Sequence, residues 1–168
     1  MSIRALSACA VVLAAAVSAC ATAPAPIYAA PSSAFNAEDF AWSARGGQAS
    51  IEGRVQYRQD GRAYSCTGSA GLTPETPYTR ARFLTLYGTV DGAAIPEAVV
   101  RARTVADSSA DYRTFVRSVP CTAGRFSFTG LPDGGWFIIV PVSAEGADRI
   151  VVMKRVETRG GRAVSVVL

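Results

Sequence analysis

Residues 124–140 read GRFSFTGLPDGGWFIIV, and they carry the clearest β-strand pattern of the chain. Phe126 and Phe128 stand two positions apart, so both side chains fall on one face of a β-strand and supply apolar area to a core. Residues 131–135 contain the Pro, Asp and Gly residues that are typical of a tight turn. Residues 136–140 are apolar throughout, which predicts a strand covered on both faces. The stretch therefore predicts two strands joined by a turn.

Further strand patterns precede this stretch. Apolar and polar residues alternate over residues 49–58, which predicts a half-buried strand. Asp60-Gly61 follows and predicts a two-residue hairpin turn, because such a turn needs positive φ. A second short strand is predicted at about residues 70–73. Pro74 and Pro77 argue against any helix directly after it.

Strand patterns also follow residue 111. Residues 112–119 alternate, and residues 149–157 and 162–168 predict two closing strands joined at Gly160-Gly161. Short strands separated by Gly and Pro turns at regular spacing predict an all-β fold, a single antiparallel β-sandwich. Residues 79–110 carry the weakest pattern: Phe83, Leu84 and Leu86 fit a strand, while residues 96–105 fit a short helix.

The predicted central strand at 136–140 requires cover on both of its faces. Its alternate residues are apolar on both faces, but a two-layer sandwich covers only the inner face of each sheet. We therefore expect either residues 79–110 or the aromatic segment 35–42 to cover the second face. A bare second face would instead be a candidate partner interface.

The first twenty residues predict export. Arg4 precedes an apolar run that ends in Val17-Ser18-Ala19-Cys20, which resembles the lipobox of bacterial lipoproteins. The resemblance implies removal of residues 1–19, the signal peptide, and acylation of Cys20, with palmitate among the possible acyl chains. The lipid would anchor the protein to the membrane, on the periplasmic face of the cell envelope. Ala21, in place of Asp, favours the outer over the inner membrane. An ordinary secretory signal cut nearby is the alternative.

Residues 20–46 are predicted to form a lipidated tether, and residues 47–168 the folded domain. Ala-Pro repeats such as residues 23–26 predict an extended, semi-rigid spacer. Phe35, Phe40 and Trp42 interrupt it. They are expected to dock on the domain, with binding to a partner as the alternative.

Composition excludes several functions. The chain of 168 residues has a net charge of +4, too little for a nucleic-acid protein, so no nucleic-acid partner is expected. It contains no histidine, which removes Ser-His-Asp and Cys-His mechanisms and most zinc sites. Asp107 and Asp111 could form a carboxylate pair for glycoside hydrolysis or part of a calcium site. Their loop, however, contains no further acidic residues at a suitable spacing. We therefore expect no enzyme activity, cofactor or metal.

Cys66 and Cys121 remain once Cys9 in the signal and Cys20 are set aside. An even pair in an oxidising compartment predicts a disulfide, with two buried free thiols as the alternative. A closed loop of about 55 residues would stabilise the fold by about 4 kcal/mol in the chain-entropy description.

The pattern Gly-x-Phe-x-Phe, Leu131-Pro132 and an aromatic-rich strand resembles the carboxypeptidase regulatory-like domains, which are prealbumin-like (transthyretin-like) β-sandwiches. Cys66-x-Gly68 and the spaced residues Leu72, Pro74, Thr76 and Tyr78 resemble a bacterial subset. The resemblance covers about residues 49–143, skips 84–111 and departs at Thr122. It implies a Greek-key sandwich. It implies no peptidase activity, which resides elsewhere in the proteins named after the domain.

Two surfaces are candidate binding sites. Arg113, Phe115 and Arg117 fall on one face of the predicted strand 112–119, where they would bind anionic glycans or lipopolysaccharide phosphates. The alternative is an ordinary solvated face. Five tyrosines could form a surface on which sugar rings stack: Tyr57, Tyr64, Tyr78, Tyr87 and Tyr112. The alternative is that they are half-buried strand residues.

The favoured function is a non-enzymatic envelope lipoprotein, a structural or protein-interaction module whose partner is an envelope protein or glycan. The alternative is a carbohydrate- or peptidoglycan-binding module.

Overall fold

The computed structural model describes residues 33–66, 68–105 and 111–168. The predicted signal peptide and the acylation site Cys20 lie outside these residues. The helical elements are η1 (Ala37–Ala44), α1 (Pro77–Tyr87), α2 (Glu97–Ala102) and η2 (Tyr112–Phe115). The strands are β1 (Ala49–Arg54), β2 (Arg58–Gln59), β3 (Arg62–Ala63), β4 (Ser65–Cys66), β5 (Ser69–Pro74), β6 (Gly92–Pro96), β7 (Arg117–Pro120), β8 (Arg125–Leu131), β9 (Gly134–Ser143), β10 (Ile150–Thr158) and β11 (Ala163–Val167).

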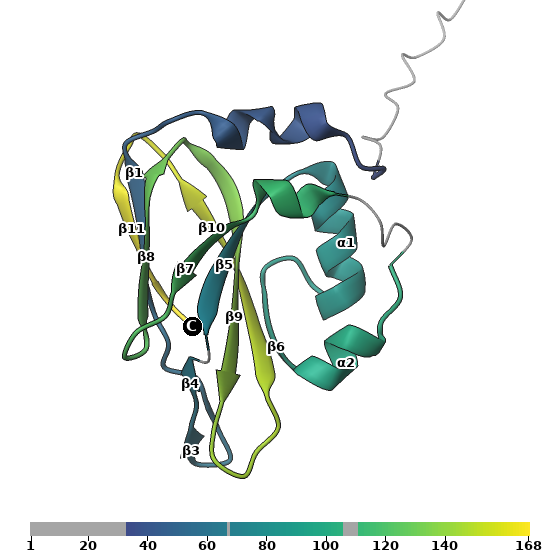
Figure 1. Cartoon of the computed structure of the whole chain (residues 1–168), viewed down its shortest axis with the longest axis vertical. Coiled ribbons are helices and arrows are strands. Elements are labelled where there is room, and N and C mark those ends of the chain that lie inside the picture. The colour runs from purple at the N-terminus through teal and green to yellow at the C-terminus, as the bar shows by residue number, and fades with distance from the viewer. Residues whose placement is uncertain (1–32, 67, 106–110) are drawn as a thin grey trace, which may run out of the picture. The chain divides into compact units, whose positions relative to one another are not determined.

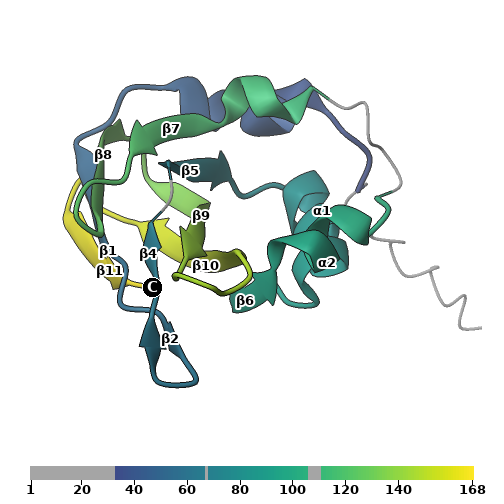
Figure 2. The same cartoon turned by 60° about the horizontal axis from the view of Figure 1, so that its bottom comes forward.

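Two packed sheets confirm the predicted all-β sandwich. Within the described residues, the small sheet has the order β11-β1-β8, and the large sheet the order β6-β10-β9-β5-β7, with β4 also paired to β9. Figure 1 shows the small sheet on one side of the large sheet and α1 and α2 on the other. The short hairpin β2–β3 projects from one end, as Figure 2 shows.

One strand pair departs from the predicted antiparallel arrangement. β1 pairs with β11 in parallel, with Gly53 opposite Val166. The two closing strands were predicted at the right residues, but β10 lies in the large sheet and β11 in the small one. The chain therefore crosses between layers at the turn Gly160-Gly161, and β11 does not fold back on β10 as a hairpin partner.

The first core lies between the two sheets. Trp136, Ile138 and Val140 of β9 are fully buried there and face Phe126 and Phe128 of β8. A Cβ at position 53 of β1 would run into the ring of Phe126, so only glycine leaves room for that ring. The period-two pattern of residues 124–140 therefore identified one side of each sheet correctly.

The second core lies on the other face of the large sheet. Phe137 is fully buried there, and its ring meets that of Phe83 of α1 edge-on, with the centroids 4.7 Å apart. Tyr87 of α1 together with Val151 and Met153 of β10 completes the buried cluster. The prediction that residues 79–110 or 35–42 would cover this face is confirmed, and α1 with the following residues provides the cover.

The predictions for the start of this cover were wrong. Residues 77–87 form α1, whereas Pro77 predicts no helix here and Phe83 fits a predicted strand. Proline at the first helical turn is favoured because its missing N–H would be unpaired there in any case. Thr76 and Thr79 form a capping box before it, and Gly88 ends the helix with φ 77°. The short helix predicted within residues 96–105 is confirmed as α2.

The aromatic segment docks, so the predicted boundary between tether and domain at residue 46 moves towards the N-terminus. Phe40 of η1 is fully buried, and the ring of Trp42 lies edge-on to that of Trp136 with the centroids 4.8 Å apart. Arg117 Nη2 donates a hydrogen bond to the carbonyl of Ser43 at 2.8 Å. Residues 33–46 are thus part of the folded domain.

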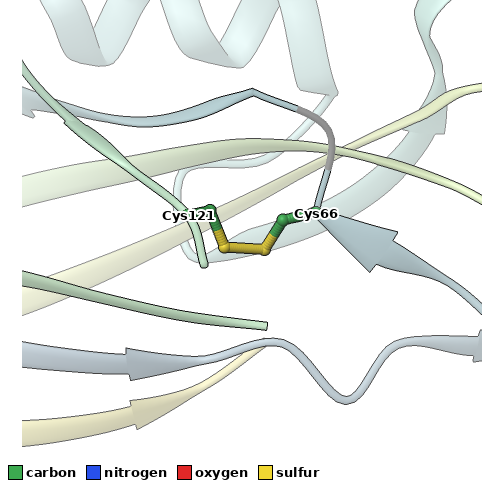
Figure 3. Close-up of a disulfide and its surroundings, with 2 residues drawn as sticks. All are labelled: Cys66 and Cys121. Atoms are coloured by element: carbon green, nitrogen blue, oxygen red, sulfur yellow. A yellow bond between two sulfur atoms is a disulfide. The ribbon is translucent and has the colours of Figure 1, made fainter. Parts of the chain in front are cut away.

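Cys66 and Cys121 form the predicted disulfide, with their Cα atoms 5.9 Å apart (Figure 3). Cys66 ends β4 in the large sheet, and Cys121 stands where the chain leaves β7 for the small sheet. The bond therefore ties the large sheet to the turn that enters β8.

Candidate functional site

The predicted surface of Arg113, Phe115 and Arg117 does not form one strand face. Arg113 and Phe115 belong to η2, and Arg117 begins β7. The ring of Phe115 stacks on that of Phe40 with the centroids 4.7 Å apart, while the Arg117 guanidinium lies 5.7 Å from the centre of the Trp136 ring. The two residues hold η1 in place, and Arg113 is exposed. The alternation of so short a segment did not distinguish a strand from a single helical turn.

The five tyrosines do not share a surface. Tyr57 and Tyr64 pair edge-on near the hairpin, and Tyr78 and Tyr112 pair near α1. Tyr87 is buried in the second core, and burial raises its pKa to about 12. The expected signature of a neutral-sugar site, several exposed coplanar rings, is absent from these described tyrosines.

The titratable groups form no metal cluster in the described part of the chain, where no three His, Cys, Asp or Glu side chains gather. Asp107 of the weighed carboxylate pair lies outside that part. Nor does any described helix combine the length and apolarity that a membrane crossing requires.

A hollow of about 560 Å³ lies on the outer face of the small sheet. Neighbouring strand residues point to opposite faces, and those at 53, 126 and 166 point into the core. Their backbone therefore forms the floor, and the exposed residues on either side of them form the rim. The lining is Glu52, Gly53 and Arg54 of β1, Arg125, Phe126 and Ser127 of β8, Ser165, Val166 and Val167 of β11, with Pro120 and Thr122.

Strand register arranges the rim in two rows. Ser127 and Ser165 stand on either side of Glu52, with all three side chains exposed. In the next row Arg125 and Val167 stand on either side of Arg54. The hollow thus offers hydroxyls and a carboxylate in one row and two guanidinium groups in the other. Such a set can donate and accept several hydrogen bonds to a hydroxyl-rich molecule.

The two arginines of the hollow are directly opposite one another across the β1–β8 pair. Within the described residues, neither side chain has an ion-pair or hydrogen-bond partner, and both are exposed. The alternation of residues 49–58 puts Arg54 on their polar face, but it does not identify the strand that lies beside that face. Arg125 carried no signal of its own.

The ion pairs with the most buried acidic partner lie on the face of the large sheet that carries α1. Glu75 follows β5, and its side chain is only 11 % exposed. Its Oε2 accepts hydrogen bonds from Arg155, at 2.8 Å from Nε, and its other oxygen pairs with Arg80. Burial raises the pKa of the Glu75 carboxyl, but the hydrogen bonds from Arg155 and Arg80 outweigh burial and leave that pKa below its ordinary value. These charges are satisfied within the domain and hold α1 to the large sheet.

A solved structure that shares this fold is that of a "putative carbohydrate binding protein" from Pseudomonas aeruginosa. The two sequences are 21% identical, and the superposition covers 80% of this chain and 96% of that chain with a TM-score of 0.56. At this identity the similarity establishes a common fold. No protein family matches the sequence of this chain, and no curated protein matches it.

Proposed function

We propose that this protein is a non-enzymatic binding module of the bacterial cell envelope, and that it binds carbohydrate on the outer face of the small sheet. The hollow carries the proposal. Its rim combines Ser127, Ser165 and Glu52 with two arginines on a hydrogen-bonded sheet, and within the described residues none of these side chains forms a hydrogen bond or an ion pair. The strands fix the backbone positions from which these side chains project, so the sheet need not rearrange to bring them to a ligand.

The fold adds support. The structurally similar Pseudomonas aeruginosa protein carries a carbohydrate-binding name. A shared fold does not fix a function, so this name supports the proposal only together with the hollow. The assignment to the carboxypeptidase regulatory-like, prealbumin-like sandwiches belongs to this proposal, on the motif of residues 124–132.

The protein-interaction role favoured from the sequence has one candidate surface fewer. A bare second face of β9 would have been a candidate partner interface, but Phe83 and Tyr87 of α1 pack on it. The hollow is the better candidate because its rim is polar and exposed.

A bulky side chain in the hollow should abolish carbohydrate binding. Ser165→Trp places an indole over the backbone floor, and the expected result is at least a tenfold loss of affinity, measured by electrophoresis in gels that contain neutral or acidic polysaccharides. Leu84→Trp is the matched control, because Leu84 is 55% exposed on α1 at the other side of the large sheet. A protein that no polysaccharide in the panel retards would refute the proposed function.

The envelope location rests on the lipobox and has its own test. Cys20→Ser removes the acylated thiol, so the expected result is release of the protein from membranes into the soluble fraction. Two acyl signals hold a protein firmly, whereas none remains in the variant. Detergent phase partitioning of the two proteins measures the change. Wild-type protein that already enters the aqueous phase would contradict the lipid anchor.

A further inference from the structure

We propose that the ligand of the hollow is an acidic polysaccharide, whose carboxylates are held between Arg54 and Arg125. This inference rests on the proposed function and specifies its substrate class. The starting observation is the register of β1 and β8, which sets the two arginines opposite one another on an exposed face. Like charges at such positions destabilise a strand pair. An anion bound between them would turn this repulsion into attraction on both sides.

A further cation, Lys154 of the large sheet, contacts the backbone of one lining residue but does not itself line the hollow. Lys154 Nζ of β10 donates a hydrogen bond at 3.0 Å to the carbonyl of Val167, and Val167 is the register partner of Arg54. Glu52 is the acidic residue of the rim, and within the described residues it forms no ion pair with either arginine. The arginine row of the hollow is therefore locally positive and complementary to carboxylate.

The rest of the rim fits a sugar rather than a simple anion. Ser127 and Ser165 stand one row away from the arginines, on either side of Glu52, and their hydroxyls match the hydroxyls of a pyranose ring. The outward residues of the three described strands include no aromatic side chain. A neutral sugar that depends on ring stacking would have no platform here, so charge and hydrogen bonds must supply the affinity.

Two arginines opposite one another are expected to lower the stability of the strand pair. Replacing one arginine by glutamine removes the cross-strand repulsion while keeping much of the side-chain length. The free energy of unfolding of Arg54→Gln should therefore equal or exceed that of the wild type. A side chain retained for stability alone would give the opposite result.

The experiment measures binding of the full-length protein to three acidic polymers, polygalacturonate, alginate and hyaluronate, and to fully methyl-esterified polygalacturonate. Esterification removes the charge and leaves the sugar backbone in place. The expected result is that at least one of the three acidic polymers binds at least tenfold more tightly than the methyl ester does. Polygalacturonate and its ester are the matched pair for this comparison. Arg54→Gln and Arg125→Gln should each weaken that binding about tenfold, since each removes charge-assisted hydrogen bonds. Added salt should weaken wild-type binding.

Arg113→Gln is the matched control, because it removes one exposed arginine from η2 and leaves the hollow intact. It should change affinity less than twofold. An equal loss in Arg113→Gln would overturn the arginine clamp, since net charge alone would then explain the binding. Equal binding to the acid and its ester, or binding of neutral glycans only, would overturn the acidic substrate class and leave the proposed function standing. Failure to bind any acidic or neutral polymer would overturn both.

Discussion

Trp136→Ala is expected to lower the free energy of unfolding by about 3–5 kcal/mol, the range for truncation of a large buried aromatic side chain. Trp136 is fully buried in the first core, and its Nε1 donates a hydrogen bond to Thr158 Oγ1 at 3.1 Å. The ring also contacts Trp42 of η1 and the guanidinium of Arg117. The substitution therefore opens a cavity and weakens the docking of the N-terminal segment together.

Urea unfolding followed by far-ultraviolet circular dichroism measures this loss. Trp136→Phe keeps a ring in the core but removes the N–H donor, so its loss should be smaller, about 1–2 kcal/mol. Leu84→Ala, at an exposed position on α1, should stay within about 0.5 kcal/mol of the wild type. A loss below about 1 kcal/mol for Trp136→Ala would mean that Trp136 does not organise the first core.

Replacing Cys66 and Cys121 together by alanine is expected to cost about 2–5 kcal/mol. The disulfide joins residues 55 positions apart in the sequence, so its loss gives the unfolded chain a large gain in conformational entropy. The substitution also weakens the folded state near the bond, because the disulfide holds the end of β4 beside the turn that leads into β8. The double substitution avoids leaving a single reactive thiol.

The measurement compares oxidised wild type, reduced wild type and the double variant in urea. The reduced protein and the double variant should show similarly lowered midpoints. Peptide mapping without reduction should recover the two cysteine peptides joined. Two thiols that alkylate fully in freshly isolated native protein would contradict the disulfide, and an unchanged midpoint in the double variant would contradict its stabilising role.

Strands were predictable from the sequence where the alternation was strong. Residues 124–140 predicted β8 and β9 because Phe126 and Phe128 share a face and the next strand is apolar on both faces. The helix α1 was missed because the rule against proline was applied to Pro77, which stands in the first turn where that rule does not hold. The capping residues Thr76 and Thr79 were a signal that the sequence did contain.

The candidate site could not be predicted in the same way. Arg113, Phe115 and Arg117 were grouped by spacing alone, and the structure divides them between a helical turn and a strand and uses two of them to dock η1. Arg54 and Arg125 stand far apart in the chain. Nothing in the residues around either one identifies the other as its neighbour.

Several local features of this protein follow from its sequence alone: the strands with period-two burial, the pairing of its two remaining cysteines and the need to cover both faces of β9. Each of these features depends on neighbouring residues or on composition, so patterns in the sequence predict it. Tertiary structure alone decided that β11 would run parallel to β1 and that Arg54 would lie opposite Arg125. Register between distant strands follows from how the whole core packs, and a shift of one residue would turn the arginine away from this face.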